Sequence, residues 1–176
     1  MAFPLAVAVS SCARHAGEPM SRNRLFWNAT GVDSEGFTFL KSVYQKSAFE
    51  VELAKYVQSS PASAEAKKLA AGIVQAYEPL VAELEELGNS FHVILPDSGT
   101  PAFAVPHQFA ADSLGGFDSN GYIAHAQHEQ AEILEQFDVA DRNTVKSLRA
   151  YAAEKLPAVK EVFALAGGHE EHGAHH

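Results

Sequence analysis

The sequence predicts an all-α fold, a four-helix bundle in which one long connection separates the second and third helices. Four stretches carry apolar residues at the three- and four-residue spacing of a helix face. Two connections are short corners, whereas the 28 residues from Asn89 to Gly116 include three prolines. A helix of about 23 residues is about 35 Å long, so this connection can return along the bundle. Short corner, long crossover and short corner form one plan of a four-helix bundle.

The first two helices follow from the pattern in the first half of the bundle, which we expect to span residues 34–167. The first should run from Ser34 to Gln58, with one charged residue, Glu50, on its apolar face. Ser60 should cap the second helix, and Gly88-Asn89 should end it. The expected core positions are Leu40, Val43, Ser47, Val51, Ala54 and Val57, then Leu69, Ile73, Ala76, Leu80, Leu84 and Leu87.

The third and fourth helices form a hairpin with recognisable ends. Asp118 or Ser119 can cap the third helix by accepting a hydrogen bond from a first-turn N–H, and Asp141 or Asn143 can cap the fourth. Gly167-Gly168 should end the fourth helix. The expected core positions are Ile123, Ala126, Gln130, Ile133, Leu134 and Phe137, then Val145, Leu148, Ala152, Leu156, Val159 and Phe163.

Two prolines lie inside these helical patterns, Pro79 in the second helix and Pro157 in the fourth. A proline removes one N–H and crowds the carbonyl four residues before it. We expect a kink near Gln75 and a kink or restart near Ala153.

The residues before the bundle suggest export. Residues 1–11 are apolar and small, and Val9-Ser10-Ser11-Cys12 resembles a bacterial lipobox, in which a signal peptidase cuts before a cysteine that carries lipid. No Lys or Arg precedes the short apolar stretch, unlike in a typical signal peptide. We expect a signal-like segment over 1–11 and lipid on Cys12, which as the only cysteine can form no internal disulfide. Ordinary cleavage, or a cytoplasmic protein, are the alternatives.

Residues 12–33 are mostly polar and should tether the bundle to the anchor. Leu25, Phe26 and Trp27 are the exception. They either pack back on the bundle or contact a protein partner.

The charge distribution restricts the partners. The formal net charge of −9 argues against nucleic acid. Between Lys68 and Arg142 there are twelve Asp or Glu and no Lys or Arg. This acidic stretch is either a solvated surface or a site for a basic partner or cations.

Histidines indicate two possible metal sites. In the third helix His125 and Glu129, and His128 and Glu132, are one turn apart, a spacing found in chelating pairs and on ordinary solvated faces. Residues 168–176 form a His-rich tail in which His169, His172, His175 and His176 could weakly bind Cu, Zn or Ni, or simply keep the chain soluble.

Several segments resemble the domain-of-unknown-function 4142 family: FLKSVYQKSAFEVELAKYVQ, AKKLAAGIVQAYEPLVAELEELG, FDSNGYI and YAAEKLPAVKEVFALA. The resemblance implies a ferritin-like four-helix bundle in the bacterial envelope. It also implies a Glu in the first helix and often His in the other three. Glu50 matches, but the remaining positions hold Tyr77, Gln130 and Glu161. No helix contains the Glu-x-x-His of a di-iron site. Glu50 should therefore be a hydrogen-bonded core carboxylate, paired with Tyr77 or Gln130, in a metal-free interior.

The sequence contains no Gly-x-Ser-x-Gly turn and no CxxCH haem site. The leading hypothesis is a non-enzymatic, lipid-anchored periplasmic protein whose bundle is a binding or scaffold module for a protein partner at the membrane. One alternative is an accessory small subunit of a membrane-associated periplasmic oxidoreductase complex. The other is a metal-handling protein that uses the His-rich tail.

Overall fold

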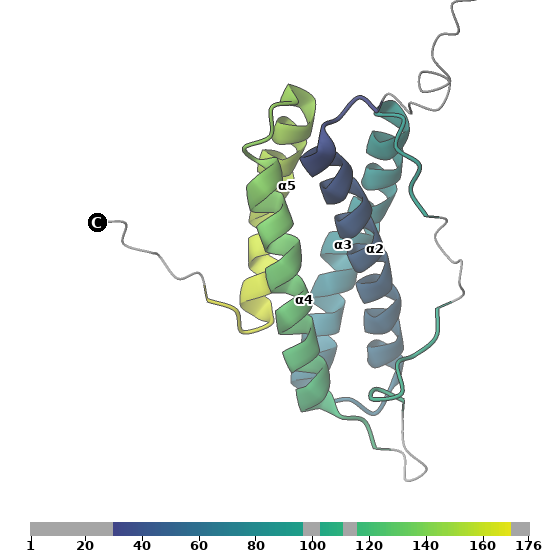
Figure 1. Cartoon of the computed structure of the whole chain (residues 1–176). Helices are drawn as coiled ribbons and strands as arrows, with labels where there is room; N and C mark the ends of the chain where they lie inside the picture. The colour runs from purple at the N-terminus through teal and green to yellow at the C-terminus, as the bar shows by residue number, and fades with distance from the viewer. Residues whose placement is uncertain (1–29, 97–102, 111–115, 170–176) are drawn as a thin grey trace, which may run out of the picture.

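The computed structural model describes residues 30–96, 103–110 and 116–169. Its regular elements are four helices, α2 (Ser34–Ser59), α3 (Ala64–Ser90), α4 (Ser119–Ala140) and α5 (Lys146–Leu165) (Figure 1). The described part of the chain has no strands, so the predicted all-α four-helix bundle is confirmed. The segment between α3 and α4 is the predicted crossover. Cys12, the Leu25–Trp27 segment, and His172, His175 and His176 lie outside the described residues.

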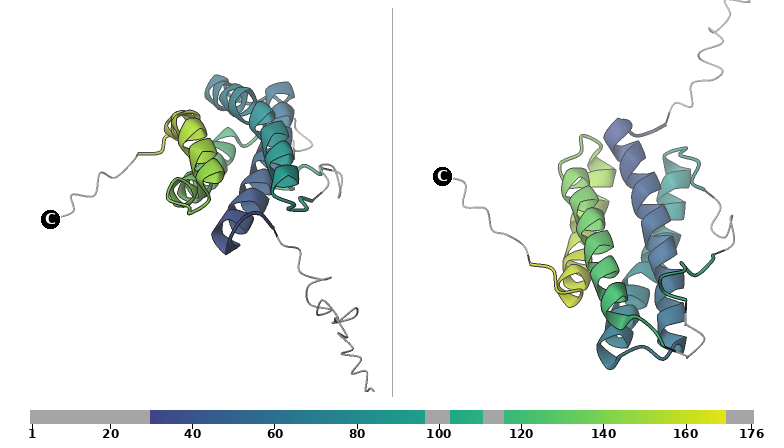
Figure 2. Two further views of the ribbon diagram at one scale, coloured as in Figure 1. Left: turned by 90° about the horizontal axis from the view of Figure 1, so that it is seen from above. Right: turned by 60° about the horizontal axis from the view of Figure 1, so that its bottom comes forward.

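The helices form a square in which α2 and α5 each pack on both α3 and α4. Seen from above, the pairs α2–α3 and α4–α5 lie beside each other (Figure 2). The crossover returns the chain along the bundle, so α3 and α4 run in the same direction (Figure 1). Their first turns are linked, because the backbone N–H of Ser63 donates to Ser119 Oγ at 2.8 Å.

The predicted apolar faces form the core. All six positions expected in α2 are buried, and Glu50 is fully buried among them. In α3 the buried face includes Tyr77 and Gly88, while Ala76 and Leu87 are only partly buried. In α5, Val162 is buried and Phe163 is partly buried. The faces are therefore rotated slightly from those predicted, but the set of helices that meet in the core is the same.

Two predicted helix ends in the first half were wrong. Ser60 does not cap α3: its N–H donates to the carbonyls of Tyr56 and Val57, so it closes α2, and Ser63 caps α3 by accepting from Ala66 N–H at 3.1 Å. Gly88 does not end α3, which continues to Ser90. A Cβ at Gly88 would lie 2.9 Å from Leu95 Cδ1, so this glycine permits the crossover to approach the helix.

Asp33 joins three parts of the fold at one end of the bundle. It caps α2 by accepting a hydrogen bond from Gly36 N–H at 2.8 Å, and it also accepts bonds from Asn143 Nδ2 at 2.9 Å and Thr144 Oγ1 at 3.0 Å. The bonds from Asn143 and Gly36 lower the pKa of Asp33.

Neither Asp141 nor Asn143 caps α5, which begins after Val145. Asn143 Oδ1 instead accepts a hydrogen bond from Val145 N–H. At the third helix, Asp118 is the predicted cap.

Both internal prolines are accommodated without a break. The helices α3 and α5 are continuous through Pro79 and Pro157, so the restart considered at Pro157 does not occur. Both prolines are exposed, as are Gln75 and Ala153, whose carbonyls lose a helical partner. Those carbonyls can bond to water, which makes an internal proline tolerable.

Candidate functional site

A buried carboxylate paired with a histidine lies at the interface of α2 and α4. Glu50 on α2 is fully buried, and its Oε1 lies 3.0 Å from Nε2 of His125 on α4. The hydrogen bond to Glu50 raises the pKa of His125, although burial acts in the opposite direction. Glu50 is therefore a hydrogen-bonded core carboxylate, as predicted, but its partner is His125 rather than Tyr77 or Gln130.

Tyr77 and Gln130 bond to each other next to this pair, with the Tyr77 hydroxyl donating to Gln130 Oε1. Both side chains are buried. Burial, and then the charge of Glu50, raise the pKa of Tyr77 and of Tyr122. Polar groups from three helices thus meet in the core. Glu161, the fourth position of the family pattern, is exposed on α5 and does not join them.

This polar cluster is not fully satisfied. Glu50 Oε2 and the Tyr122 hydroxyl are buried without a hydrogen-bond partner among the described residues. Unpaired buried polar atoms are costly. The His125 bond is consequently the main compensation that the described residues provide for burying Glu50.

Two aromatic rings lie against the imidazole of His125. Its ring centroid lies 6.3 Å from that of Phe49 on α2 and 5.2 Å from that of Phe109 in the crossover. Phe103, also in the crossover, lies 5.6 Å from Phe49. The crossover therefore packs against the His125 side of the α2–α4 interface. Irregular segments give no periodic signal, so sequence reasoning missed this contact.

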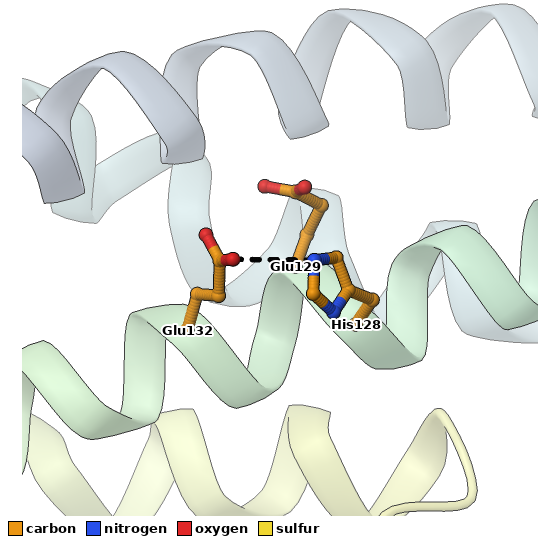
Figure 3. A group of neighbouring side chains, drawn as sticks. All are labelled: His128, Glu129 and Glu132. Carbon is orange, nitrogen blue, oxygen red and sulfur yellow. Dashed lines mark ion pairs between the residues drawn. The ribbon is translucent and has the colours of Figure 1, made fainter.

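A second cluster lies at the outer edge of the same interface and contains His128, Glu129 and Glu132 of α4 (Figure 3). His128 Nε2 is 3.2 Å from Glu132 Oε1, so these two residues, one turn apart, are in contact. The pair predicted between His125 and Glu129 is replaced by two other contacts, since His125 bonds to Glu50 and Glu129 bonds to Lys46.

Lys46 on α2 was missed by sequence reasoning. Its Nζ lies 2.7 Å from Glu129 Oε2 and 2.6 Å from Glu132 Oε2. Burial alone would lower the pKa of Lys46, but the bonds to both glutamates raise it. Lys46 precedes Glu50 by about one turn, which was the available signal, but only the register of α2 against α4 identifies its partners.

An open groove of about 370 Å³ lies between α3 and α5. Its charged lining has three carboxylates, Glu83, Glu86 and Glu154, and one ammonium, Lys155. Lys155 Nζ is 2.8 Å from Glu83 Oε2 and 3.1 Å from Glu154 Oε1. The groove is therefore acidic overall, and Tyr151, Leu87 and Ser90 complete its lining.

Of the predicted tail site, only His169 lies among the described residues, and it is exposed. The tail begins beside α4, because Gln127 Nε2 donates to the carbonyl of Gly167 at 3.1 Å. Gly167 has φ of +84°, the conformation that favours glycine after a helix.

The fold and these clusters define an all-α bundle with a buried glutamate bonded to a partly buried histidine, and with charged outer faces. Residues 27–167 match the family model described as Domain of unknown function (DUF4142), and the chain belongs to this family. Neither the curated proteins nor the solved structures include a match to the chain. Among the described residues, no helix combines the length and apolar character needed to cross a membrane.

Proposed function

We propose that this chain is a non-enzymatic, lipid-anchored protein of the bacterial envelope whose bundle binds a protein partner at the membrane. The observation that carries the proposal is the acidic groove between α3 and α5. Its three carboxylates outnumber its one ammonium, and Tyr151 and Leu87 offer apolar surface beside them. This combination suits a partner segment that exposes Lys or Arg, since complementary charge favours encounter and sets specificity.

The groove lies at the end of the bundle where the chain from the proposed anchor arrives. The backbone N–H of Gly31 donates to the carbonyl of Phe91 at 2.8 Å, and Phe91 follows Ser90, which lines the groove. The 19 residue steps from Cys12 to Gly31 can span at most about 65 Å. Lipid on Cys12 would therefore keep Gly31, which lies beside the groove, within about 65 Å of the membrane surface.

A partner at the membrane is compatible with a role as accessory small subunit of a periplasmic oxidoreductase complex. In that case Leu25, Phe26 and Trp27 would add apolar contacts next to the charged groove, because large aromatic residues contribute strongly to interfaces when buried.

The test is purification of the full chain from native membranes in mild detergent. Intact mass should show that the protein begins at a lipid-modified Cys12. Retention of residues 1–11, or a free Cys12 thiol, would contradict the anchor.

The groove is tested by cross-linking on the same material. A zero-length reagent that joins carboxylates to lysines should link Glu86 or Glu154 to one partner. The double variant Glu86→Lys/Glu154→Lys should lose that partner, whereas the control Glu35→Lys/Glu135→Lys should keep it. Equal recovery by both variants would refute the groove as the binding surface.

Metal handling by the tail is a second candidate, supported by the four histidines and two glutamates within residues 168–176. We expect His169, His172, His175 and His176 to bind Cu²⁺, Zn²⁺ or Ni²⁺ with modest affinity, since ordering a tail costs conformational entropy. Affinity should fall at acid pH, because a protonated imidazole cannot bind a metal ion. Titration of the full chain is compared with a variant that has alanine at all four positions. Unchanged tight binding by the variant would assign the metal elsewhere.

A further inference from the structure

The outer edge of the α2–α4 interface carries three side chains able to bind one metal ion. One donor atom each from His128, Glu129 and Glu132 lies within 4.8 Å of the other two (Figure 3). We propose that these residues form a binding site for a divalent transition-metal ion such as Zn²⁺, and that the ammonium of Lys46 competes with the ion for it.

The spacing of the donors fits such an ion. Two ligands bound at roughly 2.0–2.2 Å in a tetrahedral arrangement are about 3.3 Å apart. His128 Nε2 and Glu132 Oε1 are 3.2 Å apart. Both residues are on one helix, at a spacing of one turn, so the pair needs little rearrangement to chelate.

The donor set selects the class of metal. One imidazole and two carboxylates suit Zn²⁺, Cu²⁺ or Ni²⁺, whereas Ca²⁺ and Mg²⁺ prefer oxygen ligands only. Water can complete the coordination, because the side chain of His128 is 69% exposed and that of Glu132 is 43% exposed.

A second observation, from another helix, shows that this position attracts a cation. Lys46 Nζ reaches across from α2 and lies 2.7 Å from Glu129 Oε2 and 2.6 Å from Glu132 Oε2. The ammonium thus takes carboxylate oxygens that a metal would use, and its charge repels an incoming ion. Displacing it breaks both ion pairs and moves a long, flexible side chain towards solvent. Lys46 therefore keeps the site weak, and its removal should strengthen metal binding.

This site needs neither the His-rich tail nor the proposed protein partner. The titration is therefore made on the full chain with alanine at His169, His172, His175 and His176, which removes the tail as a source of binding. Zn²⁺ is added and followed by calorimetry in a buffer that does not bind metal, with helicity monitored by circular dichroism.

One Zn²⁺ should bind per chain. Lys46→Gln should raise the affinity about tenfold, as expected from loss of a competing charge. His128→Ala and Glu132→Gln should each lower it by more than about tenfold, because two ligands remain. The controls Lys41→Gln, which makes the same change in charge on α2, and Glu135→Gln on α4 should bind as the parent does. An excess of Mg²⁺ should not compete.

Absorption of bound Co²⁺ gives a second readout, since its intensity reports the coordination geometry. It should disappear in His128→Ala while helicity stays unchanged. Equal affinity of parent and Lys46→Gln would overturn the competition. A Zn²⁺ affinity and a Co²⁺ spectrum that are both unchanged in His128→Ala would overturn the site.

Discussion

Replacing His125 by alanine should lower the free energy of unfolding by about 3 kcal/mol at neutral pH, because breaking a buried ion pair leaves a buried charge uncompensated. Glu50 is fully buried, its Oε1 bonds to His125 at 3.0 Å, and its Oε2 has no partner among the described residues. The measurement is denaturant unfolding followed by circular dichroism. His128→Ala on the same helix is the control, since it alters an exposed side chain and should change stability by less than about 0.5 kcal/mol.

The pH dependence of the same variant gives an independent check. Glu50 raises the pKa of His125 above its ordinary value of 6.5, while Glu129 and Lys46 act on it with opposite signs. A raised pKa means that the stabilisation is complete below pH 6.5 and is lost as pH rises through the raised pKa. Wild-type stability should fall over that interval, and this fall should be absent from His125→Ala.

A double variant shows whether His125→Ala is destabilised by the unpaired charge of Glu50 or by the loss of packing around His125. Glu50→Leu/His125→Leu should be close to wild type in stability, because an apolar pair often replaces a buried ion pair without loss. If His125→Ala is as stable as His128→Ala, the pair does not stabilise the bundle.

Phe137→Ala should cost about 3 to 5 kcal/mol of unfolding free energy, as large-to-small substitutions in a packed core do. Phe137 is fully buried on α4, and its ring meets that of Phe39 on α2 edge to face with centroids 5.1 Å apart. Unfolding in denaturant should show a lower midpoint with an unchanged slope.

Ile94→Ala is the matched control, because Ile94 is a large apolar residue that is 79% exposed. Its substitution should change stability by less than about 0.5 kcal/mol. A double cycle with Phe39→Ala should give a coupling of about 0.5 to 1.5 kcal/mol. A loss below about 1 kcal/mol in Phe137→Ala would mean that this part of the core repacks around the gap.

The helices could be predicted from the sequence because burial is periodic along each of them. The stripe from Leu40 to Val57 is buried throughout, and the acidic position within it, Glu50, is buried as expected. Helix ends were less predictable where two residues can serve equally well. Ser60 and Ser63 could each cap α3. The choice depends on where α2 ends: Ser60 N–H bonds to the last carbonyls of α2, so Ser63 is left to cap α3.

The partners of polar groups were predictable only within one helix. His128 and Glu132, which are one turn apart on α4, lie in contact, with Nε2 3.2 Å from Oε1. His125 lies at the border of the core face of α4, between buried Tyr122 and Ala126 on one side and the outer face on the other. Whether the side chain of such a residue bonds to a partner in the core or to one on the surface depends on the rotation of α4 about its axis relative to α2. Residue spacing within α4 contains no information about that rotation.

The crossover has a consequence for how the chain folds. It separates two antiparallel hairpins, α2–α3 and α4–α5, each of which is closed by a short corner and makes mostly local contacts. Local contacts form early, because closing a short loop costs little entropy, whereas docking one hairpin on the other must close a much longer loop. The contacts that complete docking include Glu50 with His125 and Lys46 with Glu129, which are 75 and 83 residues apart. The polar side chains at the α2–α4 interface should therefore be among the last to reach their native partners during refolding.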